Sequence, residues 1–466
     1  MSFSHTSPDA PARSLPARRL RRFLSAAVFA GLVAVISLAF VPYGAVDPWW
    51  AAVFQAAVFA LAALWAVEGA VGGDWVSREQ LVAAPLALLA LYALVQSWTV
   101  SFDPYETRLA AAQLAALALA LALLVRYASS ERRLRVLVYT VVAVGAASAL
   151  FGILRQASQH EALGYLLARL PRGSGYAQFI NKNHFAYLAE MALGLLWGVA
   201  AGGGVPRRKL LVPVAVALPV WAALVLSNSR GGLFAMLCQV IFLAATFGAA
   251  HGWRVPEAGR RGHAVRERAA VERIARSKVA RGALALALLA TIVVGMVWLG
   301  GDSLADRVAS VGEEAVSAGG VDSTRTGRKD IWAAAWEMFE DNPLTGVGIG
   351  GFWIAVSRYH RGSGESVPQQ AHNDYLEALA SGGVVGASAV ALFLLLFLRL
   401  SASRLREGTP FSRAACLGAL TGLLGVAVHS LVDFGLHVPA NAYAAVALVA
   451  IATVRINGQK TSHNEY

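Results

Sequence analysis

Charged residues are scarce in this chain. Asp, Glu, Lys and Arg make up 15% of its 466 residues, whereas 57% are hydrophobic. A water-soluble domain carries about a quarter charged residues, so the composition excludes a soluble globular protein. Cysteine is rarer still: there are 2, Cys238 and Cys416, and both lie inside long apolar runs. This excludes a disulfide framework and gives no sign of a thiolate metal site.

Long apolar runs fill most of the remaining sequence. A helix needs about 20 residues to cross a hydrocarbon core about 30 Å thick, and about 12 runs reach that length. The predicted spans are 24–41, 49–69, 81–99, 109–126, 134–154, 184–200, 210–227, 232–250, 282–300, 376–399, 413–432 and 439–455. We therefore expect an all-α, polytopic membrane protein with about 12 transmembrane helices, the earlier ones within 24–300 and the last ones within 376–455.

Acidic residues are rarer than basic ones: the chain has 28 Asp and Glu and 40 Lys and Arg, which gives a net charge of +12. The basic residues gather in the first tail, 1–23, and in the loops on the same side of the membrane. Such loops are typically cytoplasmic, and no small-residue cleavage site follows the first apolar run, as a signal peptide would require. We expect both tails, 1–23 and 456–466, in the cytoplasm.

The densest basic stretch runs from Arg254 to Arg281. On a soluble chain it would indicate nucleic-acid binding, but it holds no aromatic residue that could stack a base. We expect no nucleic-acid partner, and contact with anionic membrane lipids is the simpler interpretation.

One loop on the opposite side, 301–375, is long enough to form a small extramembrane domain, which we expect to be mainly helical. Its segment RKDIWAAAWEMFED, 328–341, has apolar residues at helical spacing. The predicted apolar face consists of Trp332, Ala335, Trp336 and Phe339. We expect this face to pack against the membrane domain.

A glycine-rich segment, TGVGIGGFW, follows this helix and begins at Thr345. Closely spaced glycines can bring backbone amides close to an anion such as phosphate. They can equally form a tight turn with no ligand. The sequence leaves both interpretations open.

Ionisable residues near membrane depth are costly, so those that persist are candidates for function. Five motifs carry them, all on the outer side: VPYGAVDPWW with Asp47, FINKNHF with Lys182 and His184, SNSRGG with Arg230, AHNDYLE with His372, and HSLVDFGLH with His429, Asp433 and His437. Each group could be a helix cap or an interfacial anchor. Histidine is also the usual group for proton transfer near neutral pH, and the convergence on one face favours a site.

His372 starts a longer pattern. The pattern is a His followed by Asn, Ser or Gln, then nine residues, a Gly, two residues, and finally Gly, Thr or Tyr. This chain fits it with His372, Asn373, Gly383 and Gly386. This pattern resembles the ligase motif of the O-antigen ligase and polymerase superfamily of bacterial envelope glycan assembly. The segments RKDIWAAAWEMFEDNPLTGVGIGGF, SNSRGG, FINKNHFAYLAEM and HSLVDFGLHVPANAYAA also resemble segments of that superfamily. The resemblance extends from about residue 176 to 450, and the first five spans match only in character.

The resemblance implies an inverting, metal-independent glycosyltransferase of the bacterial inner membrane with its active site facing the periplasm. Its donor would be a glycan on undecaprenyl diphosphate, and its acceptor lipid A-core, another lipid-linked glycan or a protein hydroxyl. By the same resemblance His372 would be the general base, and Arg230 and Arg328 would bind the diphosphate. Arginine suits phosphate oxygens. Further expected substrate-binding residues are Lys182, His184 and Asn373.

We expect no cofactor and no metal, because the sequence contains no carboxylate pair or DxD set for a divalent ion. Asp302 and Asp306 are the nearest substitute, and a solvated helix start explains them better. A proton- or anion-coupled transporter is the alternative from another class, although no internal repeat typical of transporters is present. The sequence does not separate ligase, O-antigen or exopolysaccharide polymerase and protein O-oligosaccharyltransferase, nor does it assign roles to Asp47, Asp433, His429 and His437.

Overall fold

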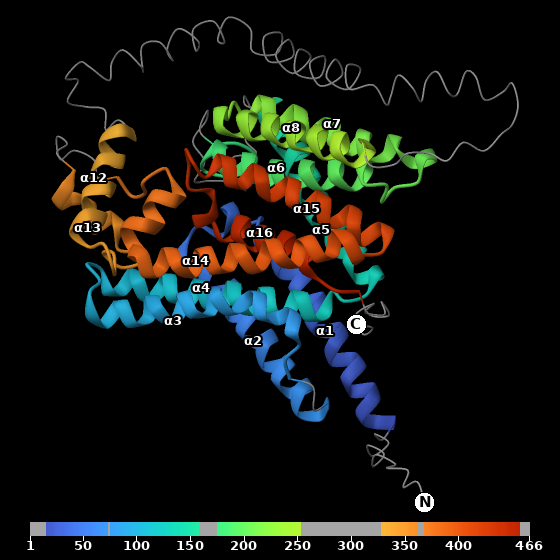
Figure 1. Cartoon of the computed structure of the whole chain (residues 1–466), viewed down its shortest axis with the longest axis horizontal. Coiled ribbons are helices and arrows are strands. Elements are labelled where there is room, and N and C mark those ends of the chain that lie inside the picture. The colour runs from blue at the N-terminus through green and yellow to red at the C-terminus, as the bar shows by residue number, and fades with distance from the viewer. Residues whose placement is uncertain (1–14, 73–74, 158–174, 253–327, 361–367, 457–466) are drawn as a thin grey trace, which may run out of the picture.

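The computed structural model describes residues 15–72, 75–157, 175–252, 328–360 and 368–456 (Figure 1). Within these ranges every regular element is a helix, and the one β-type pairing is an isolated bridge between Tyr176 and Phe179. The predicted all-α class is confirmed.

The described α-helices are α1 (Leu15–Leu38), α2 (Pro48–Gly72), α3 (Ala84–Thr99), α4 (Pro104–Tyr127), α5 (Glu131–Ala157), α6 (Lys182–Ala201), α7 (Leu211–Leu226), α8 (Arg230–Gly252), α12 (Arg328–Asp341), α13 (Phe352–Tyr359), α14 (Asp374–Glu407), α15 (Pro410–His429) and α16 (Pro439–Thr453). Among the described residues, 9 helices are long and apolar enough to cross a membrane. The chain is thus a multi-pass membrane protein.

Two shorter apolar helices, Arg230–Thr246 and Pro439–Thr453, coincide with two further predicted spans. The predicted span 282–300 and the first part of the loop, 301–327, lie outside the described residues. The total of about 12 spans and the extent of the outer loop therefore remain predictions.

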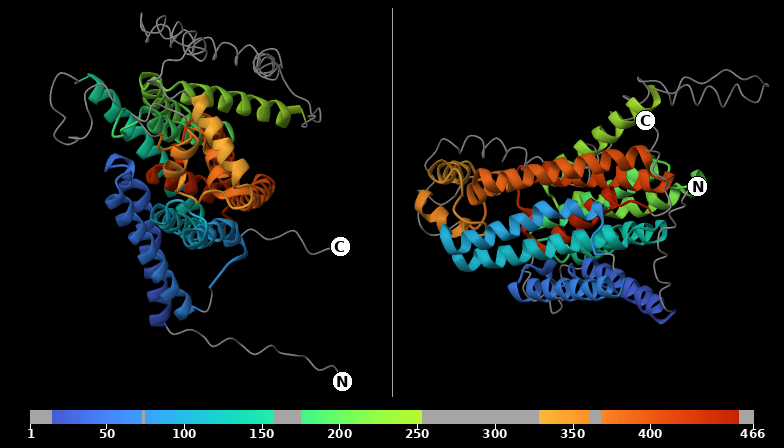
Figure 2. Two further views of the ribbon diagram at one scale, coloured as in Figure 1. Left: turned by 90° about the vertical axis from the view of Figure 1, so that its left-hand side faces the viewer. Right: turned by 60° about the horizontal axis from the view of Figure 1, so that its bottom comes forward.

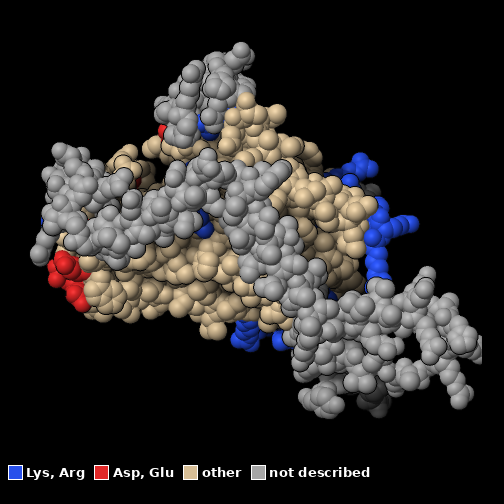
Figure 3. Space-filling view, turned by 90° about the horizontal axis from the view of Figure 1, so that it is seen from above, with Lys and Arg blue, Asp and Glu red and all other residues tan. Residues whose placement is uncertain are grey.

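The helices run roughly along the long axis of the molecule (Figure 1). One end holds α12, α13 and the α3–α4, α7–α8 and α15–α16 connections, and we call it the site end. The start of α1 and the end of α16 lie toward the other end. On the face seen in Figure 3, Lys and Arg side chains lie mainly toward that second end and the visible acidic side chains mainly toward the site end.

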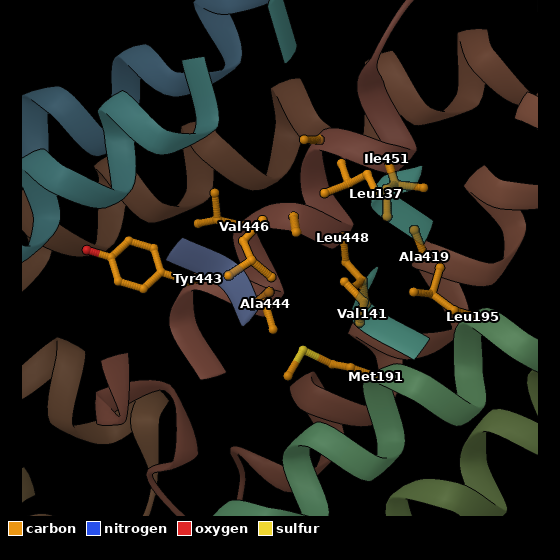
Figure 4. Packing of buried hydrophobic residues seen from close by; sticks show 14 of the residues in the cluster. Leu137, Val141, Met191, Leu195, Ala419, Tyr443, Ala444, Val446, Leu448 and Ile451 are labelled. Carbon is orange, nitrogen blue, oxygen red and sulfur yellow. The ribbon is translucent and has the colours of Figure 1, made fainter. Parts of the chain in front are cut away.

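The centre of the bundle is formed by α6, α15 and α16. A Cβ added at Gly194 or Gly198 would overlap with the backbone of Gly422 or Gly418, so α6 and α15 touch along a line of glycines. Small residues let membrane helices approach this closely. Figure 4 shows apolar side chains of α5, α6, α15 and α16 meeting in this core. The close packing fixes the start of α6 relative to the end of α15, and both of these termini carry residues of the candidate site.

Helix α14 is broken at Gly383, whose φ of 59° and ψ of −164° are not helical. A break leaves helix carbonyls and amides without their normal partners, which is costly in apolar surroundings. The freed carbonyls find other donors: Val347 N donates to Ala380 O (3.0 Å), Gly348 N to Ser381 O (3.0 Å) and Tyr92 Oη to Gly382 O (3.1 Å).

The amides after the break are also paired. Val384 N donates to Pro343 O (2.9 Å) and Val385 N to Leu344 O (3.2 Å). Gln96 of α3 completes the junction, since its Nε2 donates to Thr345 O (2.6 Å) and its Oε1 accepts from Ile349 N (3.1 Å). Helix α3 lies beside both α4 and α14 (Figure 2). The glycine-rich segment is joined to α3 and α14 by these hydrogen bonds.

These contacts decide between the two interpretations of the glycine-rich segment. Its amides at Val347, Gly348 and Ile349 donate to protein oxygens, and a Cβ at Gly346 would overlap with the Ser381 carbonyl. The glycines allow a close backbone approach that caps the broken helix, so the tight-turn interpretation holds and these three amides do not serve an anion.

The apolar face predicted for α12 is only partly correct. The buried residues are Ile331, Ala334, Ala335 and Met338, which pack with Val347, Phe352 and Ala355. Trp332 contributes through its Nε1, which donates to Ala371 O (2.9 Å). Trp336 is 47% exposed and pairs with Phe339 at a centroid distance of 5.4 Å. The predicted face followed the aromatic residues, but the face that packs consists of Ile331, Ala334, Ala335 and Met338, which have the same helical spacing and are shifted by about one residue.

We expect Gly383→Ala to destabilise the protein by about 1–3 kcal/mol, because the backbone adopts positive φ and the new Cβ would overlap with Leu344 O. Thermal unfolding of purified protein in detergent measures this effect. Gly386→Ala is the matched control, since its Cβ would come no closer than 3.8 Å to Leu89 and Tyr92 and alanine favours a helix. Equal midpoints for the two variants would contradict the assigned role of the break.

Candidate active site

The first segment of α14, before Gly383, carries the residues around His372 onto the α15–α16 connection. Asp374 N donates to Ser430 O (2.9 Å), and Ser430 Oγ donates to Asp374 Oδ2 (2.6 Å). Asn373 is the N-cap of α14, because its side chain accepts hydrogen bonds from Tyr375 N (3.1 Å) and Leu376 N (3.0 Å). The side chain of Asn373 thus has a structural task, and its substrate contact stays a prediction.

His372 has a φ of 51°, a left-handed conformation that is uncommon for residues other than glycine and that clusters at functional sites. Its side chain is 33% exposed, and its Nδ1 lies 4.0 Å from Asp433 Oδ1. Asp433 is 1% exposed and accepts hydrogen bonds from Asn183 Nδ2 and Phe434 N. A buried, held carboxylate therefore faces one nitrogen of a partly exposed imidazole, at a separation longer than a hydrogen bond. These are the residue types of a base and its orienting carboxylate.

The electrostatic surroundings keep this imidazole neutral. Burial lowers the pKa of His372, Asp433 opposes that effect, and the positive charge of Arg328 adds to the lowering. The net direction is down from the ordinary histidine value, so His372 can accept a proton at neutral pH.

Phe434 lies at the meeting point of three histidines. Its ring centroid is 4.8 Å from that of His372, 5.0 Å from that of His184 and 6.2 Å from that of His437. The motifs FINKNHF, AHNDYLE and HSLVDFGLH thus meet in one place, although they are far apart in the sequence.

The SNSRGG turn is built against a second buried pair. His429 Nδ1 lies 2.7 Å from Glu190 Oε1, both side chains are almost fully buried, and Tyr187 stacks on the His429 ring at 4.3 Å. A Cβ added at Gly231 would lie 2.5 Å from the His429 ring. Glycine is therefore required directly after Arg230, which begins α8 with an exposed side chain.

The other predicted residues lie around this centre. Arg328 begins α12, is exposed, and is close enough for its charge to lower the pKa of His372. Lys182 begins α6 and is exposed, whereas His184 is buried and its carbonyl accepts from Asn441 Nδ2 (2.9 Å). Asp47 precedes α2, where its carbonyl accepts a hydrogen bond from Ala51 N (3.0 Å).

Sequence reasoning missed several residues of this region: Asn183, Glu190, Asp374, Glu377 and Phe434. Glu190 had a usable signal, since a carboxylate in an apolar span is costly and marks function. Asp374 and Glu377 also gave a usable signal, because two carboxylates three positions apart at the start of a span lie on the same face of the helix. Asn183 is an ordinary helix-start residue and Phe434 an ordinary loop residue, so their proximity to His372 appears only in three dimensions.

Among the described residues, no group of three or more His, Cys, Asp or Glu side chains has the arrangement of a metal site. Asp302 and Asp306 lie outside the described residues.

Residues 214–391 match the family model described as O-antigen ligase. The matched segment contains Arg230, Arg328 and His372, and it confirms the resemblance that the motifs indicate. No curated protein matches the chain.

We expect Asp433→Asn to lower the pKa of His372 further, because the carboxylate is the group that raises it. The pH dependence of diethyl pyrocarbonate modification at His372, followed by mass spectrometry of purified protein, measures this shift, since only neutral imidazole reacts. Asp47→Asn is the control, because Asp47 is not among the groups that act on His372, and it should leave the midpoint in place. An unchanged or raised midpoint in Asp433→Asn would show that the two groups do not interact.

Proposed function

We propose that this chain, whose residues 214–391 match the O-antigen ligase family, transfers a glycan from undecaprenyl diphosphate to an acceptor hydroxyl. The observation that carries the proposal is the pairing of His372 with the buried Asp433 at 4.0 Å inside a membrane bundle. A neutral imidazole with an oriented carboxylate is suited to deprotonating a hydroxyl group.

The proposed reaction is a single displacement. His372 takes the proton of the acceptor hydroxyl while its oxygen attacks the anomeric carbon of the donor glycan. The bond from that carbon to the diphosphate oxygen breaks, the configuration inverts, and undecaprenyl diphosphate leaves with the electron pair. Asp433 then faces an imidazolium and stabilises it, as a carboxylate does in other acid–base sites.

The leaving group carries negative charge, so the site needs positive charge more than a general acid. We propose that Arg230 and Arg328 provide it. Lys182 and His184, at the start of α6, are proposed as further substrate-binding residues, and of these two only the exposed Lys182 would add positive charge. Both arginines begin helices, and helix N-termini attract anions. No metal ion or other cofactor takes part in this proposal.

The site end is proposed to face the periplasm of the bacterial inner membrane. On the face seen in Figure 3, Lys and Arg side chains of the described residues lie mainly toward the opposite end, and loops rich in these residues stay cytoplasmic. The proposed acceptor is lipid A-core; an O-antigen or exopolysaccharide polymerase and a protein O-oligosaccharyltransferase would use the same chemistry with another acceptor. Glycan length and lipid A attachment in a deletion strain distinguish these acceptors.

We expect His372→Ala to lower the turnover of glycan transfer by roughly 10²- to 10⁴-fold, the usual effect of removing a general base, with little change in donor binding. Transfer is measured with purified protein, lipid-linked donor and excess EDTA. His360→Ala is the control, since His360 ends α13 outside the Phe434 cluster. Near-normal turnover in His372→Ala would remove it from the mechanism, and loss of wild-type activity in EDTA, restored by magnesium, would show that a metal is required.

Replacing the arginines by lysine separates charge from geometry, because lysine keeps the charge but loses the planar fork. Binding of undecaprenyl diphosphate to purified protein should weaken in Arg230→Lys and Arg328→Lys and weaken further in the alanine variants. Arg358→Lys is the control: Arg358 lies over the Phe102 ring (4.5 Å) and should not affect binding. If both alanine variants bind as tightly as wild type, the arginines are anchors.

A further inference from the structure

Three carboxylates lie near the Phe434 cluster, and the proposed reaction uses only Asp433. The other two, Asp374 and Glu377, have side chains that are 13% and 7% exposed. Both face a single nitrogen: His437 Nε2 lies 3.4 Å from Asp374 Oδ1 and 3.5 Å from Glu377 Oε1. Two buried carboxylates this close are unfavourable when both are ionised, and a cation between them relieves the repulsion.

The same two carboxylates hold the chain on both sides of His372. Glu377 Oε2 accepts a hydrogen bond from Ala371 N (2.7 Å), the residue before the imidazole. Asp374 lies two positions after the imidazole, and its Oδ2 accepts a hydrogen bond from Ser430 Oγ (2.6 Å). The intervening backbone at His372 has positive φ, a conformation that persists only when surrounding contacts enforce it.

From this arrangement we propose that His437, as a cation between Asp374 and Glu377, is a positioning residue that fixes the His372 segment against Asp433. The idea rests on the proposed function, because it assigns His437 a role in the orientation of the base. We call this arrangement of His437, Asp374 and Glu377 the clamp. His437 does not need to touch the substrate for this role.

The position of His437 is itself well defined. It ends a short turn, Gly435–His437, whose first carbonyl accepts a hydrogen bond from Asn441 Nδ2 (3.2 Å). A Cβ at Gly435 would overlap with the Tyr187 ring, so the turn sits tightly on α6. The fold therefore brings His437 to the two carboxylates of α14 from a separate, rigid element.

The clamp depends on pH, because His437 is a cation only when it is protonated. The His437 side chain is 40% exposed. Its partial loss of hydration would lower its pKa, but Glu377 and Asp374 outweigh that effect and raise it. The other titratable group affected by its charge is His184 of α6. A raised pKa means that the cation is present at lower pH and is lost as pH rises through that value. Because the pKa of His372 is lowered, the active range lies between the two titrations.

The test is the pH profile of glycan transfer by the full-length protein in detergent, with kcat and the donor KM measured separately. Wild type should show an acid limb from His372 and an alkaline limb from His437. His437→Gln should lower kcat by about 10- to 100-fold, as expected for a misplaced catalytic group, with the donor KM unchanged. His437→Arg carries a permanent cation, so it should recover much of that kcat and lose the alkaline limb.

A second variant keeps the test independent of folding at position 437. Glu377→Gln can still accept the hydrogen bond from Ala371 N, but it removes one negative charge, so the alkaline limb should move to lower pH. Glu340→Gln on α12, where Glu340 accepts from Trp336 Nε1 (2.8 Å) at the surface, is the matched control and should keep the wild-type profile.

The outcomes separate this inference from the proposed function. If His437→Gln keeps the wild-type kcat and alkaline limb while His372→Ala is inactive, the clamp is wrong and the function stands. If His437→Arg is as impaired as His437→Gln, the positive charge is not what matters and the clamp is also wrong. If wild type transfers no glycan from the lipid-linked donor, the proposed function itself fails.

Discussion

The break in α14 at Gly383 is the constraint on which the rest of the site depends. A helix crossing apolar surroundings cannot leave backbone groups unpaired, so breaking it requires replacement partners on both sides. The TGVGIGG segment, Tyr92 and Gln96 provide them. The break lets the segment that begins at Asp374 run to the α15–α16 connection, and this brings His372 next to Asp433. Helix α12, which begins at Arg328, packs against α14 and is joined by Trp332 to Ala371, just before α14.

A second feature is that three ionisable groups at the site end are each held by residues of another helix. Asp433 follows α15 and is held by Asn183 of α6; His429 of α15 pairs with Glu190 of α6; and His437 meets the carboxylates of α14. Buried charges are tolerated when they are paired in this way. The glycine contacts between α6 and α15 set the spacing of these pairs, so helix packing and site geometry are one arrangement.

Much of the fold was predictable from the sequence because the hydrocarbon core imposes length and composition on each span. Most predicted spans coincide with described helices, and the helix at 328–341 lies where its periodicity placed it. The errors occurred where small residues decide the contact. Ala334 and Ala335 are buried while Trp336 is exposed, and the glycines around Gly348 serve the backbone of α14. Hydrophobicity indicates which residues avoid water, but not how closely two backbones approach.

By itself, the sequence determined the membrane class, the all-helical fold, the concentration of ionisable residues on one side and the motif around His372. Each of these follows from local composition and spacing, which the bilayer and the chemistry of the side chains make informative. Only the tertiary structure decided that Asp433 faces His372, that Glu190 pairs with His429, and that Asp374 and Glu377 share His437. These pairs join residues that are from 60 to 239 positions apart. Their contact depends on the break in α14 and on the close packing of α6 with α15, which no local pattern encodes.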